Sequence, residues 1–114
     1  MNINNDYHCD HAESNLESVP NESSVKAIAS LYKVFGDATR VKILFSLRKA
    51  PLCVHDISKL LGVEQSAISH QLKILRDQGV VKRERIGKNN HYSLDDNHVE
   101  MILDLGLEHV EHKK

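Results

Sequence analysis

The spacing of the apolar residues changes after Gly79, and this change constrains the fold more than any other feature of the sequence. Between Val25 and Leu75 the apolar residues recur at steps of three and four positions, which is the period of an amphipathic helix. After Gly79 the period changes, and residues 80–85 and 90–94 have the pattern of two strands joined around a glycine. The sequence therefore predicts a mainly helical protein that carries one β-hairpin.

The N-terminal stretch differs from the rest of the chain. Residues 1–24 are rich in Asn, Ser and Glu and have no apolar stripe, so we expect a mobile arm ahead of a single domain, residues 25–114. In this domain a first helix is predicted from Val25 to Gly36, where the glycine ends it, and Asp37 can cap the next helix.

Three further helices are predicted after these. Pro51 is expected to open one helix, which Gly62 stops, and the next begins at Glu64 or Ser66. A last helix is predicted from about Asp96 to near the C-terminus.

The amino-acid composition indicates how large a core one chain can form and where a charged partner would bind. The chain has 114 residues with no Trp, three Tyr and two Phe, so it can bury only a modest core, and a second copy would extend that core. The formal net charge is −1, but residues 71–94 hold six Lys and Arg against Asp77 and Glu84. This stretch is the expected polyanion-binding surface.

Cysteine usage and hydropathy indicate the compartment. The chain has two cysteines, no signal peptide and no long apolar run. We therefore expect a soluble, cytoplasmic protein with reduced thiols and no membrane partner.

A pair of short helices joined at Gly62 and followed by a basic hairpin is typical of a winged helix-turn-helix. Helix pairs without a nucleic-acid role are common, but the basic hairpin, or wing, favours DNA as the partner. The second helix of such a unit enters the major groove, and the wing lies over the backbone or minor groove. The residues expected to contact DNA are Gln65, Ser66, Ser69, His70 and Lys73 on the helix and Arg83, Arg85 and Lys88 on the wing.

Four metal-binding residues form two pairs near the C-terminus, Asp96 with His98 and His109 with His112. At about 1.5 Å per helical residue, His98 and His109 are roughly 16 Å apart along the axis. One chain cannot close such a site, whereas two antiparallel copies related by a two-fold axis form two identical sites. A single histidine here would be interpreted as a solvated side chain. Three imidazoles and one carboxylate with this spacing instead predict a closed tetrahedral zinc site.

Three segments carry a resemblance to known proteins: VFGDATRVKIL at residues 34–44, SAISHQLK at 66–73 and YSLDD at 92–96. Together they resemble the ArsR/SmtB family of metal-sensing repressors, and the similarity extends over roughly residues 25–112. The resemblance implies a homodimer joined through its terminal helices, which binds an operator when metal-free and dissociates when metal binds. It also matches the four C-terminal ligands to the zinc site of the family's zinc sensors.

The same resemblance implies a second metal site. Cadmium and lead sensors of the family pair arm cysteines of one protomer with a Cys-x-Cys on the third helix of the other. This chain has Cys53-Val54-His55 there and a single arm cysteine, Cys9, and fewer thiolates favour zinc. The alternative is that Cys53 is a small buried residue beside a disordered arm. His91 is interpreted as a strand or backbone-contact residue. The candidate ligands are Cys9, His11, Cys53 and His55, with His8 and Asp10 as substitutes.

Taken together, these features predict a metal-responsive repressor that zinc releases from its operator, with cadmium or lead as alternative metals. Its expected target is a metal efflux or sequestration gene. No enzymatic activity is expected, because four protein ligands leave zinc no open position, and this argues against a zinc hydrolase. Two alternatives remain at this point, a repressor of the same fold with a non-metal inducer and a zinc-stapled structural dimer.

Overall fold

The computed structural model describes residues 12–113. The chain consists of two units, and the boundary between them falls after Tyr32 in the sequence. In the first unit, α2 (Ala12–Leu16) is a five-residue helix, and α3 (Glu22–Val34) begins there. Both lie partly or wholly within the predicted mobile arm. Asn21 explains the early start of α3, because its side-chain oxygen accepts a hydrogen bond from the Ser24 backbone N at 2.8 Å.

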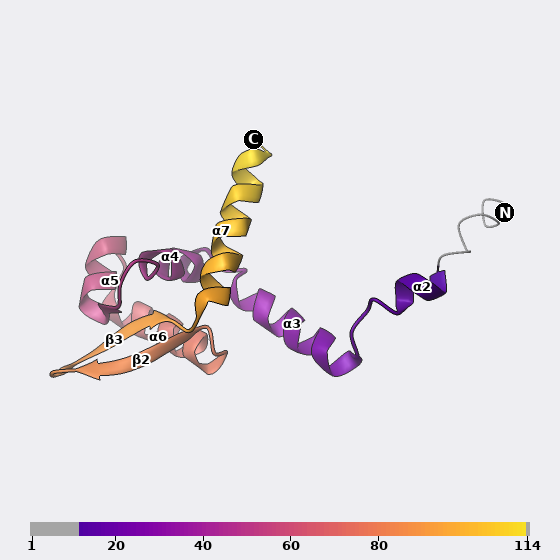
Figure 1. Ribbon diagram of the computed structural model, residues 1–114. Coiled ribbons are helices and arrows are strands. Elements are labelled where there is room, and N and C mark those ends of the chain that lie inside the picture. Colours follow the sequence, from indigo (N-terminus) through magenta and orange to yellow (C-terminus); the bar gives the residue numbers. More distant parts are fainter. Residues whose placement is uncertain (1–11, 114) are drawn as a thin grey trace. The chain divides into compact units, whose positions relative to one another are not determined.

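The second unit is built around three helices, α4 (Ala38–Ser46), α5 (Val54–Leu61) and α6 (Gln65–Asp77) (Figure 1). Asp37 caps α4 as predicted, accepting a hydrogen bond from the Arg40 backbone N at 3.0 Å. Apolar residues of all three helices meet in one core and are fully buried there: Ile43, Leu44, Ile57, Ile68, Leu72 and Leu75.

A short strand replaces the predicted start of the third helix. Leu52 and Cys53 form β1 (Leu52–Cys53), which pairs antiparallel with Tyr92 and His91 of a later strand, so α5 begins only at Val54. The prediction that Pro51 opens this helix was wrong, because a backbone pairing with a distant strand decides the conformation here.

The wing is a hairpin of β2 (Val81–Ile86) and β3 (Asn89–Leu94), and β1 extends it to a three-stranded sheet in the order β1-β3-β2. Gly87 makes the turn with a φ of 65°, a left-handed conformation that favours glycine. The structure is thus mainly helical with a β-hairpin wing, which confirms the predicted winged helix-turn-helix.

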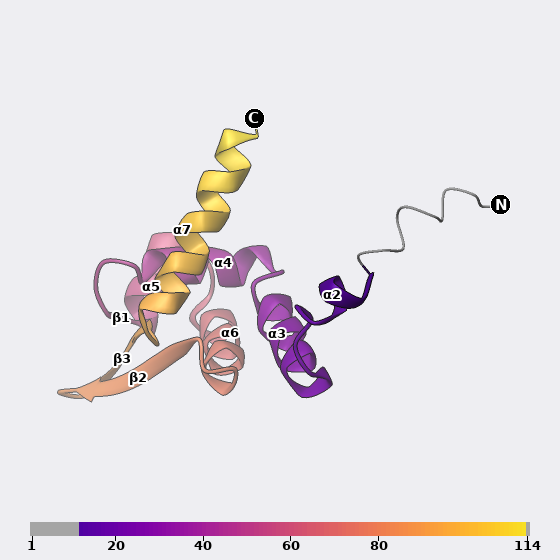
Figure 2. The same ribbon diagram turned by 45° about the vertical axis from the view of Figure 1, so that its right-hand side comes forward.

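The last helix, α7 (Asn97–His112), leaves directly from the end of β3. Val99 and Leu103 are buried against the rest of the unit, and Asp104 pairs with Arg48 at 2.6 Å. The second half of α7 extends away from the other helices of this unit in both ribbon views (Figure 1, Figure 2). None of the helices between residues 12 and 113 has the length and apolarity needed to cross a bilayer.

Candidate DNA interface and metal sites

The recognition helix α6 separates a buried face from an exposed one. Ser58 stabilises the turn before it, because its carbonyl accepts hydrogen bonds from the backbone N of Gly62 at 2.8 Å and of Val63 at 3.2 Å. Gly62 has a φ of 69°, which lets the chain reverse between the two helices. The inward face of α6 consists of the core residues Ile68, Leu72 and Leu75. The five predicted contact residues are all exposed: Gln65, Ser66, Ser69, His70 and Lys73.

The wing presents its basic residues to solvent. Arg83 and Arg85 alternate along β2 and therefore share one face, and Lys88 lies in the turn between the strands. All three side chains are exposed, as electrostatic contacts with phosphates require.

A cleft of about 340 Å³ joins the recognition helix to the wing. Three of the predicted DNA contacts, Gln65, Ser69 and Lys88, line it together with two candidate metal ligands, Cys53 and His55. The structure therefore brings part of the DNA-binding set and part of the second metal site to one place, although the sequence treats them as separate motifs.

The two N-terminal ligands of the predicted zinc site lie together. Asp96 is the N-cap of α7, and its Oδ1 accepts hydrogen bonds from the backbone N of His98 at 2.9 Å and of Val99 at 3.3 Å. Its other oxygen lies 3.3 Å from His98 Nδ1. The imidazole of His98 is 85% exposed and so is accessible to a metal ion.

The hydrogen bonds of Asp96 favour the ionised form of its carboxyl group. The side chain of His98 lowers the pKa of Asp96 below its ordinary value of 3.8; desolvation opposes this, and the backbone N–H groups of Val99 and His98 add to the lowering. A charged carboxylate is the form that binds metal.

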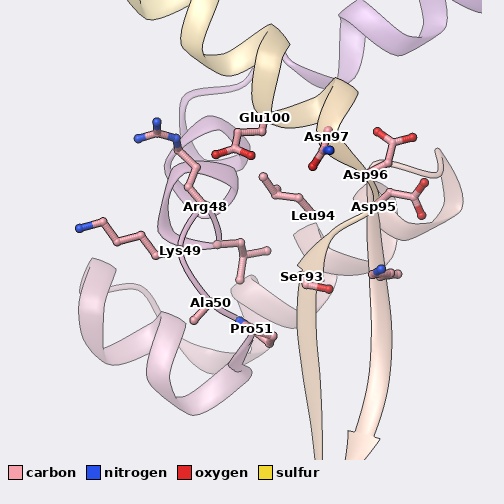
Figure 3. A pocket seen from close by; sticks show the side chains of 12 residues that line it. Arg48, Lys49, Ala50, Pro51, Ser93, Leu94, Asp95, Asp96, Asn97 and Glu100 are labelled. Carbon is pink, nitrogen blue, oxygen red and sulfur yellow. The ribbon is translucent and has the colours of Figure 1, made fainter.

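Figure 3 shows the cleft of about 270 Å³ beside Asp96, with Arg48 and Lys49 on one side and Asp95 and Asp96 on the other. The guanidinium of Arg48 is engaged by Asp104 rather than by Asp96. The side chain that contacts the Asp96 carboxylate is instead its neighbour His98, whose Nδ1 lies 3.3 Å away.

The other two ligands lie at the far end of the same helix. His109 and His112 are exposed in the last turns of α7, and the helix runs without a break from Asn97 to His112. Within residues 12–113 of one chain, no three His, Cys, Asp or Glu side chains come close enough to hold a metal ion. In this part of the chain the two predicted ligand pairs are therefore separate and do not form a complete site.

The structure describes only half of the second candidate site. Cys53 is a half-buried free thiol at the N-cap of α5, and His55 is exposed in the first turn of that helix. His55 Nδ1 lies 3.2 Å from Gln65 Nε2, so a metal ion using that nitrogen would displace Gln65. His91 lies opposite Cys53 in β3, in a strand as predicted, with its Nδ1 buried. The arm ligands Cys9 and His11, and their substitutes His8 and Asp10, lie outside the described residues.

Sequence reasoning missed two contacts, Arg48 with Asp104 and His55 with Gln65. The first joins positions far apart in the sequence, and the second joins α5 to α6 across the turn. Neither has a local signal, since each depends on how packed helices orient their side chains.

Comparison with known proteins agrees with this geometry. Residues 37–83 match the family model described as the bacterial regulatory protein, arsR family. The chain is 42% identical over 99 residues to the HTH-type transcriptional regulator NmtR of Mycobacterium tuberculosis, covering 86% of this chain and 82% of that protein. The solution structure of apo-NmtR has a TM-score of 0.70, with 43% identity over 83% of this chain and 81% of the other.

Two further relatives are regulators of the same kind. A Synechocystis transcriptional repressor SmtB homolog is 39% identical, covering 80% of this chain and 74% of that protein. A cadmium resistance regulatory protein CadC homolog of Staphylococcus aureus is 35% identical, covering 72% and 69%. The chain belongs to the ArsR/SmtB family of metal-sensing regulators. It is a metal-responsive, DNA-binding transcriptional repressor and not an enzyme.

Proposed function

We propose that this protein represses transcription as a metal-free homodimer in the cytoplasm and leaves its operator when zinc binds between the two α7 helices. The observation that supports this most is the division of one ligand set between the ends of one continuous helix. Asp96 and His98 lie at its start, and His109 and His112 in its last turns. A two-fold axis between antiparallel α7 helices would place the start of one beside the end of the other and complete two sites.

The exposed apolar surface of α7 supports the dimer. Leu105 is 61% exposed and Met101 55% exposed, although both are apolar and lie in the middle of a helix. A hollow of about 440 Å³ between α4 and α7 is also lined by apolar side chains, including Phe45, Leu107 and Val110. Exposed apolar surface of this kind is typical of an interface between subunits.

The donor set supports zinc. Three imidazoles and one carboxylate suit a tetrahedral divalent ion, and zinc has no geometric preference that this set would violate. Cadmium and lead are softer and prefer thiolates, which the α7 ligands lack. A response to either of these ions would therefore depend on the second site, formed by Cys53 and His55 with Cys9 and His11.

Release follows from the connection between α7 and the DNA-binding elements. Because α7 leaves directly from the end of the wing strand β3, ligands that fix two α7 helices against each other also fix the distance between the two recognition helices. The expected coupling free energy between metal and operator binding is about 1–3 kcal/mol. A repressor that metal releases switches on its gene when the metal is abundant. By family analogy, the regulated gene therefore encodes metal export or sequestration.

Binding of an operator fragment in zinc and in chelator tests the proposal. The site that the protein selects from random duplex DNA serves as the fragment, and its affinity is measured with zinc, with cadmium and with chelator alone. We expect tight binding in chelator and a loss of about 5- to 150-fold with zinc. Unchanged affinity with every metal ion would favour a non-metal inducer, and absence of any selected DNA site would favour a zinc-stapled structural dimer.

The second site has a separate test. If Cys9 and Cys53 share a metal ion, cadmium should produce a thiolate-to-metal absorption band that weakens when either residue is replaced by Ser. Deleting residues 1–12 should then lower the metal content from about four to about two ions per dimer, because each dimer would lose both second sites. Full stoichiometry and an unchanged cadmium spectrum after the deletion would show that Cys53 is only a packing residue.

A further inference from the structure

A hydrogen bond links the two helices of the helix-turn-helix on their exposed side. His55 lies in the first turn of α5, Gln65 is the first residue of α6, and His55 Nδ1 is 3.2 Å from Gln65 Nε2. The buried contacts between these helices are apolar, so this pair is a polar contact at the surface, where DNA would lie. This hydrogen bond therefore affects the orientation of the Gln65 side chain and not the packing of the core.

The chemistry of the two groups determines which way the Gln65 amide faces. An amide nitrogen can only donate, so the imidazole must present its Nδ1 lone pair to Gln65. One N–H of the carboxamide is then held by His55, and the other N–H and the Oε1 atom remain for another partner. Without His55 the carboxamide could turn over at little cost, because its terminal torsion is broad.

The held carboxamide lies where DNA contacts are proposed. Gln65 and His55 line the same cleft as Ser69 and Lys88, at the junction of the recognition helix and the wing. The edge of adenine in the major groove presents an acceptor, N7, next to a donor, the N6 amino group, and one N–H beside one carbonyl oxygen complements that pattern. Guanine presents two acceptors and does not match it.

We propose that His55 is an operator-specificity residue, which positions the carboxamide of Gln65 to read an adenine. This inference rests on the proposed contact between Gln65 and the operator. It assigns His55 a role in DNA recognition in addition to its candidacy as a ligand of the second metal site.

The effect should be larger in the DNA complex than in the free protein. Both side chains are exposed in the free protein, where water competes for the same hydrogen bonds. When DNA excludes water, a carboxamide that faces the wrong way leaves donors and acceptors unpaired. We expect loss of His55 to reduce discrimination at one base pair by roughly three- to tenfold, the range for one net hydrogen bond.

The test compares base discrimination among four proteins. Wild type, His55→Ala, Gln65→Ala and the double variant are titrated with the selected operator and with all its single-base variants, in chelator so that no metal ion occupies His55. We expect Gln65→Ala and His55→Ala to reduce discrimination at the same adenine. His55→Ala should have no further effect in the Gln65→Ala background.

Two additional variants separate positioning from a general loss of structure. His55→Gln places a carbonyl acceptor near Gln65 Nε2 and should restore part of the discrimination. Asp56→Asn changes an exposed neighbour in the same helical turn and should leave discrimination unchanged. The salt dependence of binding should not change with His55→Ala, since no Lys or Arg is removed.

Four outcomes would overturn the inference. The first is that His55→Ala weakens binding equally at every operator variant, and the second is that its effect adds to that of Gln65→Ala. The third is that Gln65→Ala alters discrimination at a base pair and His55→Ala does not; His55 then has no positioning role, but the proposed contact of Gln65 stands. The fourth is that Gln65→Ala alters discrimination at no base pair, which removes both the contact and the role of His55.

Discussion

Two helices of this protein, α6 and α7, differ in how much of their apolar surface the chain itself covers. The recognition helix α6 buries Ile68, Leu72 and Leu75 completely. In α7, Val99 and Leu103 are buried near the start, while Leu105 and other apolar residues further along are exposed. One chain is therefore sufficient to build the predicted DNA-binding face. The proposed sensing helix, in contrast, keeps part of its apolar surface exposed, and its two predicted ligand pairs remain apart.

This difference suits the separate roles proposed for the two helices. A DNA-recognition helix requires a well-packed core beneath it, because the side chains that contact DNA must hold their positions relative to one another. A sensing element requires two arrangements of similar free energy, which a ligand can shift. We expect zinc to shift the arrangement of α7 in this way, since the contacts of α7 within the chain are few and the proposed partner would supply the others.

The largest expected effect comes from removing a core side chain of α6. Leu72→Ala should lower the free energy of unfolding by about 2–5 kcal/mol, because Leu72 is fully buried and the change leaves a cavity. Leu105→Ala is the matched variant on α7 and should instead weaken the dimer in sedimentation or dilution experiments. If Leu105→Ala destabilises the chain as much as Leu72→Ala, independently of protein concentration, then α7 is packed within one chain and the comparison fails.

The next effect concerns the sensing site. His109→Ala should abolish zinc-driven release, a loss of about 1–3 kcal/mol of coupling, and leave operator binding in chelator intact. Fluorescence anisotropy of a labelled operator measures both quantities. Glu108→Ala, which changes the adjacent exposed residue, serves as the control. Normal release of the His109→Ala variant by zinc would remove α7 from the sensing mechanism.

The pH dependence of zinc binding tests which ligands compete with protons. Zinc affinity should fall as the pH drops between about pH 7.5 and 5.5, because a ligating imidazole must be deprotonated. Asp96 should not contribute there: its pKa lies below 3.8, so it is ionised throughout this range and gains a proton only at lower pH. A pH-independent affinity between about pH 7.5 and 5.5, measured with a competing chelator, would contradict a histidine site.

The smallest effect concerns the wing. Arg85→Ala should reduce the slope of log affinity against log salt by about one unit, or roughly three- to fourfold in affinity between 50 and 200 mM salt, because one phosphate contact is lost. Glu84→Gln changes the opposite face of the same strand and keeps every basic residue, so its slope should match that of wild type. An unchanged slope for Arg85→Ala would place the wing outside the DNA interface.

Much of the fold follows from local signals in the sequence. The cap at Asp37, the left-handed turn at Gly62 and the inward stripe of α6 are all where the pattern predicts them, since each depends on residues a few positions apart. The start of α3 was predicted too late, although Asn21 is a local signal that could have located it.

For the candidate sites, the sequence by itself determined which residues can bind metal or DNA. It also determined how far apart one helix must hold the two predicted pairs of metal ligands. The ligand pairs at the two ends of α7 follow from helical rise alone. Only the tertiary structure decided that Leu52 and Cys53 join the sheet, that His55 contacts Gln65, and that apolar side chains such as Leu105 remain exposed on α7. The physical reason is that strand pairing, contacts between helices and burial depend on segments distant in the chain, whose approach no local pattern specifies.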